Sequence, residues 1–399
     1  MNCGVPIDIS EDDRFLGMIN SQFIESVGNR NRGVRLPDFT YINVKNGVLK
    51  FDRQGANLEP HSSKYFVRYC LDFDYNTEAT APRWQSHLNR SLPNDEVRNY
   101  LGECLALPFY DGKIEKVLIL FGEPKTGKSV TLDVYKALLG RENITSESLA
   151  ALTQTGGTGD YARARLDGKL VNIASDVSKK IGDDGIAKTL ISREAVSARN
   201  PYEKGFDLEN GPRLVFSMND IPPHLVSDDA LCRRAAIIEF TEKVKPEESD
   251  TDFAVRIIKN ELAGVLNFII EGLNRLIKNK ELKEPEWCKN SVEEIRNEID
   301  PVRAWILERG YEVGENVGYS LSREYQGFVE FCRGNGNIPP GKNTFSSRLK
   351  SNGFNVDRPN NREGRLIYIE SPLKVSNING VYFDSPPTIL KGGSKIHKN

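Results

Sequence analysis

One short run of residues has the types and spacing needed to bind a polyphosphate. It reads Gly-Glu-Pro-Lys-Thr-Gly-Lys-Ser from Gly122 to Ser129. Glycines let the backbone approach phosphate oxygens closely, and successive N–H groups at the start of a helix bind those oxygens. In this pattern Lys128 reaches the β- and γ-phosphates, and the Ser129 hydroxyl holds Mg²⁺. The residues expected to bind ATP are Gly122, Glu123, Pro124, Lys125, Thr126, Gly127, Lys128, Ser129 and Val130.

The segments on both sides of this run place it between a strand and a helix. Residues 116–121 form an apolar run, typical of a buried parallel strand. Residues 130–139 put Leu132, Tyr135 and Leu138 on one helical face, and this pattern stops at Gly140. The context favours a phosphate-binding loop over a surface turn that matches the pattern by chance.

Polar residues follow two further apolar runs of the kind that form buried strands. Residues 170–174 lead to Asp176, and residues 213–218 lead to Asn219. An acid at a strand end beside a phosphate loop holds Mg²⁺ or orients the attacking water. The alternatives are local, because Asp and Asn are also common in turns and helix caps. We expect Ser129 and Asp176 at the metal, and we expect Asn219 to hydrogen-bond the γ-phosphate or the attacking water.

Two adjacent arginines, Arg233 and Arg234, precede a fourth strand-like run at residues 235–240. Such a pair is either a surface ion-pair site or a source of cations for the γ-phosphate of a neighbouring subunit. We expect one of the two to act catalytically in this way.

Residues 195–208 read as two β-prone arms around a tip that contains proline and glycine. The segment carries Arg199, Tyr202 and Lys204. Cations beside aromatic rings hold phosphates and stack the bases of a single nucleic-acid strand. A solvated turn whose aromatic rings pack on their own strands is the alternative.

The carboxyl-terminal third combines two predicted helices, 323–332 and 343–352, with a predicted hairpin that has a basic turn. A helix followed by a basic hairpin is the arrangement of a winged-helix domain, in which the helix enters the major groove and the wing touches phosphate. The alternative is a small packing domain with ordinary surface arginines. The residues expected to contact DNA here are Arg348, Lys350, Arg358, Arg362 and Arg365.

Composition limits the class of protein. The chain has 399 residues, a formal net charge of -2, six cysteines without close pairs and four scattered histidines. This length predicts several domains, and the balanced charge means that nucleic-acid binding must come from local patches. No apolar run is long enough to cross a membrane and no signal segment is seen, so we expect a cytoplasmic protein of a bacterial host cell. The cysteine pattern argues against a disulfide framework or a structural zinc site.

The motifs, taken together and in this order, resemble those of superfamily 3 helicases of the phage and plasmid primase-helicase type, akin to poxvirus-type replicative NTPases. Residues 122–129 resemble the Walker A motif, and residues 172–176 stand where Walker B lies. Residues 188–206 resemble the B-prime segment, residues 216–222 resemble motif C with its sensor asparagine, and Arg233-Arg234 resemble the arginine-finger turn. Residues 43–49 and 71–76 are similar to the domain that precedes the ATPase in this family.

The resemblance implies an α/β fold, with an AAA+-like P-loop NTPase core between an N-terminal α/β collar and a C-terminal winged helix. The expected divisions are a collar or oligomerisation domain at 1–100, an ATPase core at 101–245, a helical segment packing on the core at 246–300, a winged helix at 301–372 and a flexible basic tail at 373–399. It also implies a homo-hexameric ring with ATP between subunits and a hairpin from each subunit in the central channel. By analogy with the family, such a ring moves along one DNA strand from 3′ to 5′. One departure concerns Walker B, which often has two adjacent acids, whereas here Ser175 precedes Asp176. Whether Asp176 binds metal or activates water is therefore open, with Asp228 and Asp229 as alternatives.

The sequence thus predicts an ATP- and Mg²⁺-dependent replicative DNA helicase of a phage, plasmid or mobile island. The expected partners are single-stranded and forked DNA, origin duplex DNA, and a separate primase or polymerase. One rival is an origin-binding initiator, which would show sequence-selective duplex binding. Another is a protein-remodelling ATPase, whose hydrolysis would be indifferent to DNA.

Overall fold

The computed structural model describes residues 40–52, 55–62, 65, 67, 69–175, 181–243, 250, 252–335, 337–357 and 366–370. The chain divides into two compact units, Met1–Lys289 and Asn290–Asn399, and each is described by itself. Within the described residues, every helix is too short or too polar to cross a lipid bilayer.

A five-stranded parallel sheet carries the phosphate loop in the first unit. Its strands lie in the order β10-β4-β9-β6-β5. Their bounds are Val117–Phe121 for β4, Ile144–Thr145 for β5, Val171–Ser175 for β6, Arg213–Met218 for β9 and Ala235–Glu239 for β10. The four longer strands come from the apolar runs that predicted buried strands, and those predictions are confirmed. The unit is mixed α/β with a parallel sheet, as expected.

A smaller antiparallel sheet precedes it in sequence, with the order β1-β2-β3. Its strands are β1 (Thr40–Val44), β2 (Gly47–Asp52) and β3 (Gly55–Glu59). The pairing of Val44 with Gly47 leaves Lys45 and Asn46 as the two-residue turn of the first hairpin. A Cβ atom at Gly47 would lie 2.6 Å from the carbonyl oxygen of Glu59, so the neighbouring strand leaves room only for glycine.

Helices from before and after the parallel sheet share one apolar core with the helix that follows the phosphate loop. They are α2 (Pro82–Ser91), α3 (Asp95–Ala106), α4 (Lys128–Leu139), α10 (Phe253–Asn260) and α11 (Leu262–Asn279). Pro93 lies between α2 and α3, and the first turn of α3 is capped by the Asn94 side chain. The expected boundary at residue 100 falls within α3. A Cβ atom on Gly272 of α11 would lie 2.4 Å from the backbone carbonyl of Gly102 on α3, so these helices touch through their glycines.

The start of α2 is capped from a distant part of the chain. Its N-cap residue, Ala81, has no side chain that can cap the helix. Glu261, buried at the start of α11, accepts hydrogen bonds from the backbone N–H groups of Arg83 and Trp84 at 3.0 and 3.1 Å. It also pairs with the Arg83 guanidinium at 2.9 Å. The two orphan N–H donors at this helix end are therefore satisfied only when α11 is in place.

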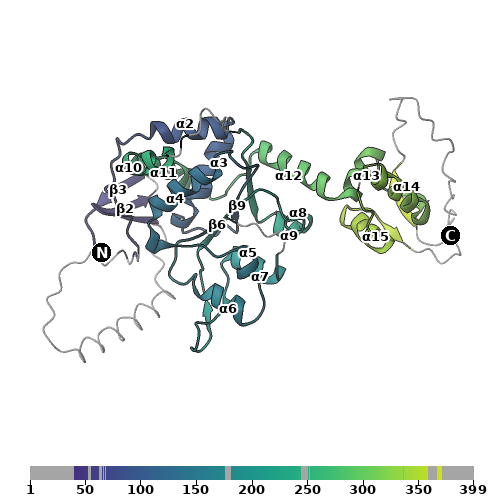
Figure 1. Cartoon of the computed structure of the whole chain (residues 1–399), viewed down its shortest axis with the longest axis horizontal. Coiled ribbons are helices and arrows are strands. Elements are labelled where there is room, and N and C mark those ends of the chain that lie inside the picture. Colours follow the sequence, from purple (N-terminus) through teal and green to yellow (C-terminus); the bar gives the residue numbers. More distant parts are fainter. Residues whose placement is uncertain are drawn as a thin grey trace, which may run out of the picture. The chain divides into compact units, whose positions relative to one another are not determined.

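Shorter elements complete the first unit. They are η2 (Leu107–Phe109), η3 (Arg141–Asn143), α5 (Leu149–Leu152), α6 (Gly157–Ala164), α7 (Asp184–Ser192), β7 (Val196–Ala198), β8 (Phe206–Leu208), α8 (Pro223–Ser227) and α9 (Asp229–Cys232). The strands β7 and β8 pair antiparallel and confirm the predicted hairpin. In Figure 1, α5, α6 and α7 lie at the end of this unit opposite α2 and α3.

The second unit alternates helices with a three-stranded sheet of order β11-β13-β12. Its elements are α13 (Pro301–Arg309), β11 (Glu312–Ser320), α14 (Leu321–Gly334), α15 (Lys342–Ser351), β12 (Val356–Asp357) and β13 (Leu366–Glu370), and α12 (Glu286–Ile299) crosses the division between units. Its core contains Trp305, Phe328 and Phe345, with the two phenylalanine rings stacked at 4.6 Å. α14 and α15 confirm the two predicted helices.

Candidate functional site

The carboxyl ends of neighbouring strands bring the predicted nucleotide residues to one edge of the sheet. Phe121 ends β4 directly opposite Met218, the last residue of β9. Gly122 and the exposed Asn219 therefore leave the sheet side by side. On the other side of β9, β6 ends at Ser175 beside Ser217. Asp176, the next residue along β6, lies outside the described residues.

The phosphate loop needs glycine at both of its ends. Gly122 has a φ of 137°, and a Cβ atom there would lie 2.3 Å from the backbone oxygen of Phe240. Gly127 has a φ of 100° and is the N-cap of α4. Between them Lys125 also has a left-handed φ, of 66°. Runs of such backbone conformations turn N–H groups towards a common concavity, which suits an anion.

Lys128 is buried within the loop that it follows. Its ammonium donates to the carbonyl oxygens of Gly122 and Glu123 at 2.5 and 2.6 Å and lies 3.4 Å from the Thr126 hydroxyl. Burial lowers the pKa of this ammonium. A polyphosphate seated on the loop would compete with the two carbonyls for a cation that is already aimed at the loop's interior.

The first turn of α4 is suited to phosphate and metal. Among the described residues no side chain caps this helix end, so the N–H groups of its first residues remain available to a ligand. Ser129 is exposed in this turn, and Val130 is half-buried next to it. The loop, its lysine and this hydroxyl could hold the triphosphate of a nucleotide, and Ser129 could supply one ligand to Mg²⁺.

Helix α2 packs directly against the phosphate loop, a contact that sequence reasoning missed. A Cβ atom at Gly127 would lie 2.4 Å from the Ser91 hydroxyl and 2.8 Å from the ring of His87. His87 Nε2 lies 2.9 Å from the Thr131 hydroxyl, which donates to the Gly127 carbonyl at 3.2 Å. Burial, and then the nearby Arg90, lower the pKa of His87 to about 4. A histidine and a serine on one helix gave no signal that could have predicted this role.

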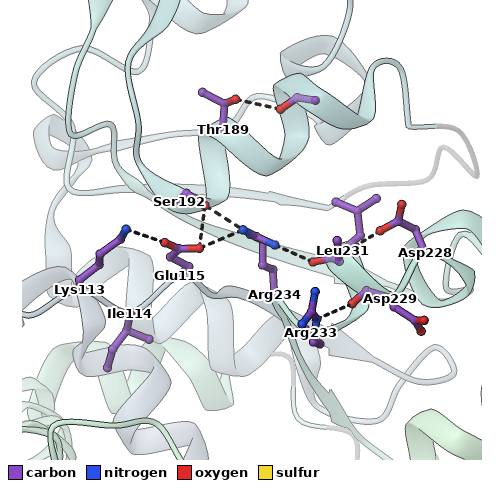
Figure 2. A network of polar contacts seen from close by, with 12 residues as sticks. Lys113, Ile114, Glu115, Thr189, Ser192, Asp228, Asp229, Leu231, Arg233 and Arg234 are labelled. Carbon is purple, nitrogen blue, oxygen red and sulfur yellow. Dashed lines mark hydrogen bonds and ion pairs between the residues drawn. The ribbon is translucent and has the colours of Figure 1, made fainter.

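The two arginines before β10 are not equivalent (Figure 2). Arg234 is held by Glu115 at 3.1 Å, by the Ser192 hydroxyl at 3.3 Å and by the Ala230 carbonyl at 3.0 Å. Arg233 is exposed, and its Nε donates to the Asp229 carbonyl at 3.2 Å. Of the pair, Arg234 is fixed by an ion pair to Glu115, whereas the exposed guanidinium of Arg233 makes no ion pair among the residues that the structure describes.

The hairpin separates its three expected DNA residues into a tip and a base. Tyr202, with a φ of 65°, is fully exposed, and Lys204 is exposed beside it. Arg199 is held at the base, because its guanidinium stacks 5.4 Å from the ring centre of Tyr161 and donates to that hydroxyl at 3.3 Å. Tyr202 and Lys204 are thus open to solvent, whereas Arg199 attaches the hairpin to α6.

In the second unit, the described basic residues also differ in their availability. Lys350 is exposed on α15. Arg348 is half-buried and pairs at 3.0 Å with Asp300, whose carboxylate caps α13. Arg358, Arg362 and Arg365 lie outside the described residues.

Two family models match parts of the chain. Residues 120–234 match a family of unknown function, DUF5906, and residues 35–93 match the model described as D5 N terminal like. The second match supports a relationship to phage primase-helicases for the segment in front of the phosphate loop.

Solved structures with a similar course of the chain come from NrS-1. The A form apo structure of its C-terminal region has a TM-score of 0.46 at 15% identity and covers 89% of this chain and 90% of that chain. An apo structure of residues 305–718 of that protein has a TM-score of 0.45 at 13% identity and covers 90% of this chain and 100% of that chain. These likenesses are too distant to indicate a shared function.

Proposed function

We propose that the protein is an ATP- and Mg²⁺-dependent replicative DNA helicase of superfamily 3, encoded by a phage, plasmid or mobile island. The main support is the phosphate loop at the end of β4, within the strand order β10-β4-β9-β6-β5. Numbered by their order along the chain, these strands run 5-1-4-3-2, which is the order of an AAA+-type core. The phosphate loop follows the first strand and Asn219 follows the fourth, where a sensor of the γ-phosphate belongs.

In this proposal the phosphates of ATP lie on the loop and on the first turn of α4. Lys128 leaves its two carbonyl partners for the β- and γ-phosphates, and Ser129 and Asp176 hold Mg²⁺. Asn219 orients the attacking water or the γ-phosphate. The cation that completes a neighbour's site is Arg233, because Arg234 is committed to Glu115.

The ring, its DNA and its partners belong to the same proposal. A trans-acting Arg233 requires a second copy of the chain, and a homo-hexamer satisfies this requirement around one DNA strand. Tyr202 and Lys204 at the hairpin tip would stack a base and hold a phosphate of single-stranded or forked DNA. Primer synthesis would come from a separate primase or polymerase, or from a segment outside this chain.

A second candidate function is ATP-dependent origin binding, and the second unit favours it. Its elements follow the order α13-β11-α14-α15-β12-β13, with β13 between β11 and β12. Helix, strand, two helices and two strands in this order are typical of a winged helix, whose last helix enters the major groove. Lys350 on α15 would contact duplex phosphate, as would the basic segment that contains Arg358, Arg362 and Arg365.

The test compares ATP hydrolysis with and without single-stranded DNA. Lys128→Ala should abolish hydrolysis, whereas Lys204→Ala should keep basal hydrolysis but lose DNA stimulation and unwinding. Lys259→Ala, which removes an exposed lysine from α10, is the matched control and should behave as wild type. Hydrolysis by the Lys128 variant at the normal rate would refute the nucleotide site. A wild-type hydrolysis rate that does not change with DNA, together with sequence-selective duplex binding, would favour the initiator.

A further inference from the structure

Three segments far apart in sequence meet at the Glu115 carboxylate, just before β4 (Figure 2). One oxygen of Glu115 accepts from the Ser192 hydroxyl at 3.0 Å and from Arg234 Nη2 at 3.1 Å. The other oxygen pairs with the Lys113 ammonium at 2.9 Å. Hydrogen bonds from Lys113 and Ser192 hold the pKa of this carboxyl below its ordinary value. Glu115 therefore stays ionised and holds Arg234 and Ser192 together.

A second contact, one helical turn before Ser192, joins α7 to the segment that carries Arg233 and Arg234. Lys188 on α7 pairs with Asp228 at 3.0 Å. The other carboxylate oxygen of Asp228 accepts from the backbone N–H of Leu231 at 2.8 Å and so caps α9. Burial acts to raise the pKa of Asp228, but hydrogen bonds from Leu231 and Lys188 outweigh it and lower that pKa. Helix α7 is thus fixed at two points to the turn that carries Arg233.

The carboxyl end of α7 leads directly into the hairpin. Ser192 is the last residue of the helix, and the next residue, Arg193, turns the chain with a φ of 58°. The Arg193 side chain donates to the carbonyls of Gly211 and Asn210 at 2.7 and 3.1 Å. These carbonyls follow β8, so Arg193 holds the two ends of the hairpin together.

We infer that α7 mechanically links the hairpin to the Arg233 turn, and that Ser192 and Glu115 are the positioning residues of this link. The inference rests on the proposed function, since it assigns Arg233 to a neighbour's nucleotide and the hairpin tip to DNA. A DNA strand that displaces the hairpin also displaces α7, because Arg193, which holds the hairpin ends, directly follows Ser192 in the chain. The Ser192–Glu115–Arg234 contacts then carry that motion to Arg233, the residue before Arg234. DNA binding in one subunit therefore adjusts the cation offered to the next subunit.

The experiment compares the factor by which single-stranded DNA stimulates ATP hydrolysis, measured on the full chain. Ser192→Ala removes the hydroxyl that α7 gives to Glu115 and Arg234, and Ser192→Thr restores a hydroxyl. Thr189→Ala is the matched control, because the Thr189 hydroxyl lies on the same helix but donates to the Gly185 carbonyl of that helix, at 2.9 Å, and not to Glu115. The basal hydrolysis rate, the affinity for single-stranded DNA and the midpoint of thermal unfolding are measured for each variant.

The Ser192→Ala variant should lose about fivefold or more of the DNA stimulation, the lower end of typical coupling between sites. Its basal rate and DNA affinity should remain within about twofold of wild type, Ser192→Thr should recover stimulation, and Thr189→Ala should match wild type. Glu115→Gln, which keeps the shape but removes the charge, should repeat the Ser192→Ala result.

Two outcomes would overturn the inference alone. The first is DNA stimulation that survives in both the Ser192→Ala and Glu115→Gln proteins, and the second is a fall of their basal and stimulated rates by the same factor. The second result would show that these residues only support the fold. Wild-type protein without any DNA stimulation would instead overturn the helicase proposal, and it would be recognised before any variant is compared.

Discussion

Protonation of His87 should weaken the packing of α2 against the phosphate loop as the pH falls. The Thr131 hydroxyl gives its own hydrogen to the Gly127 carbonyl, so His87 Nε2 must donate to it. The other ring nitrogen, Nδ1, is then the unprotonated one, and it is buried with no hydrogen-bond partner among the described residues. A second proton would place an unsatisfied positive charge beside α4 and near Arg90.

The magnitude follows from the two pKa values of this ring. The pKa is 6.5 in the unfolded chain and about 4 in the folded protein. Between these pH values the unfolded chain binds more protons at His87 than the folded protein does. The contribution of the neutral ring to the free energy of unfolding is therefore fully present above pH 6.5 and is lost as the pH falls towards 4. The difference of about 2.5 in pKa, at about 1.4 kcal/mol for each pH unit, corresponds to about 3 kcal/mol. At about pH 5 the loss is about 2 kcal/mol.

The assay follows the ring directly and then its effect on stability. The chain has four histidines, so His87→Gln identifies the missing ring signal in a nuclear magnetic resonance titration. Urea unfolding of wild type and His87→Gln at pH 7.5 and pH 5 then gives the pH dependence that belongs to this ring. Gln keeps a donor for Thr131 and cannot take up a proton, so the variant should lose about 2 kcal/mol less than wild type over this interval.

His61→Gln is the control, because the exposed ring of His61 contacts the Lys45 carbonyl at 3.1 Å, away from the phosphate loop. This variant should keep the pH dependence of the wild type. A His87 signal that titrates near pH 6.5, or equal pH dependence in wild type and His87→Gln, would refute the reasoning.

Three further predictions concern other parts of the molecule. Arg233→Ala should abolish hydrolysis in the assembled ring without lowering thermal stability, whereas Arg234→Ala should destabilise the fold by about 1–3 kcal/mol, measured by urea unfolding; equal stability of the two variants would contradict the assignment. Gly122→Ala should eliminate binding of a fluorescent ATP analogue and cost about 1–3 kcal/mol from backbone strain alone. Its Cβ atom would also meet the Phe240 carbonyl oxygen at 2.3 Å, and an unchanged affinity would disprove this tight fit. Lys350→Ala should weaken duplex binding and reduce the slope of log affinity against log salt by about one; an unchanged slope would mean that this lysine does not contact phosphate.

The parts of the fold that were predictable are those with a strong local pattern. The apolar runs before Gly122, Asp176 and Asn219 each predicted a strand, because strands buried on both faces are apolar throughout. The two β-prone arms of residues 195–208 predicted the hairpin of β7 and β8, because proline and glycine at the tip favour a turn. By contrast, β11 contains glutamate, glycine and asparagine without alternation, so only its pairing with β13 makes it a strand.

The candidate site was predictable where its residues belong to a local motif or directly follow an apolar run that forms a buried strand. Spacing alone marked Lys128 and Ser129, but it could not separate Arg233 from Arg234. That distinction depends on Glu115, which is 119 residues from Arg234 along the chain and pairs with it only in the folded protein. The packing of His87 against Gly127 is likewise a contact between residues far apart in sequence, and no local pattern encodes it.

The cap that Glu261 places on α2 also orders events while the chain is being synthesised. A ribosome releases α2 and the phosphate loop well before residue 261, and until then Arg83 and Trp84 lack the carboxylate that satisfies their N–H groups. A short helix without its cap or its packing partners is only marginally stable in water. Until α11 has emerged, the nascent chain therefore lacks the capped and packed α2 that contacts Gly127, so the phosphate loop gains this support only late in the synthesis of the first unit.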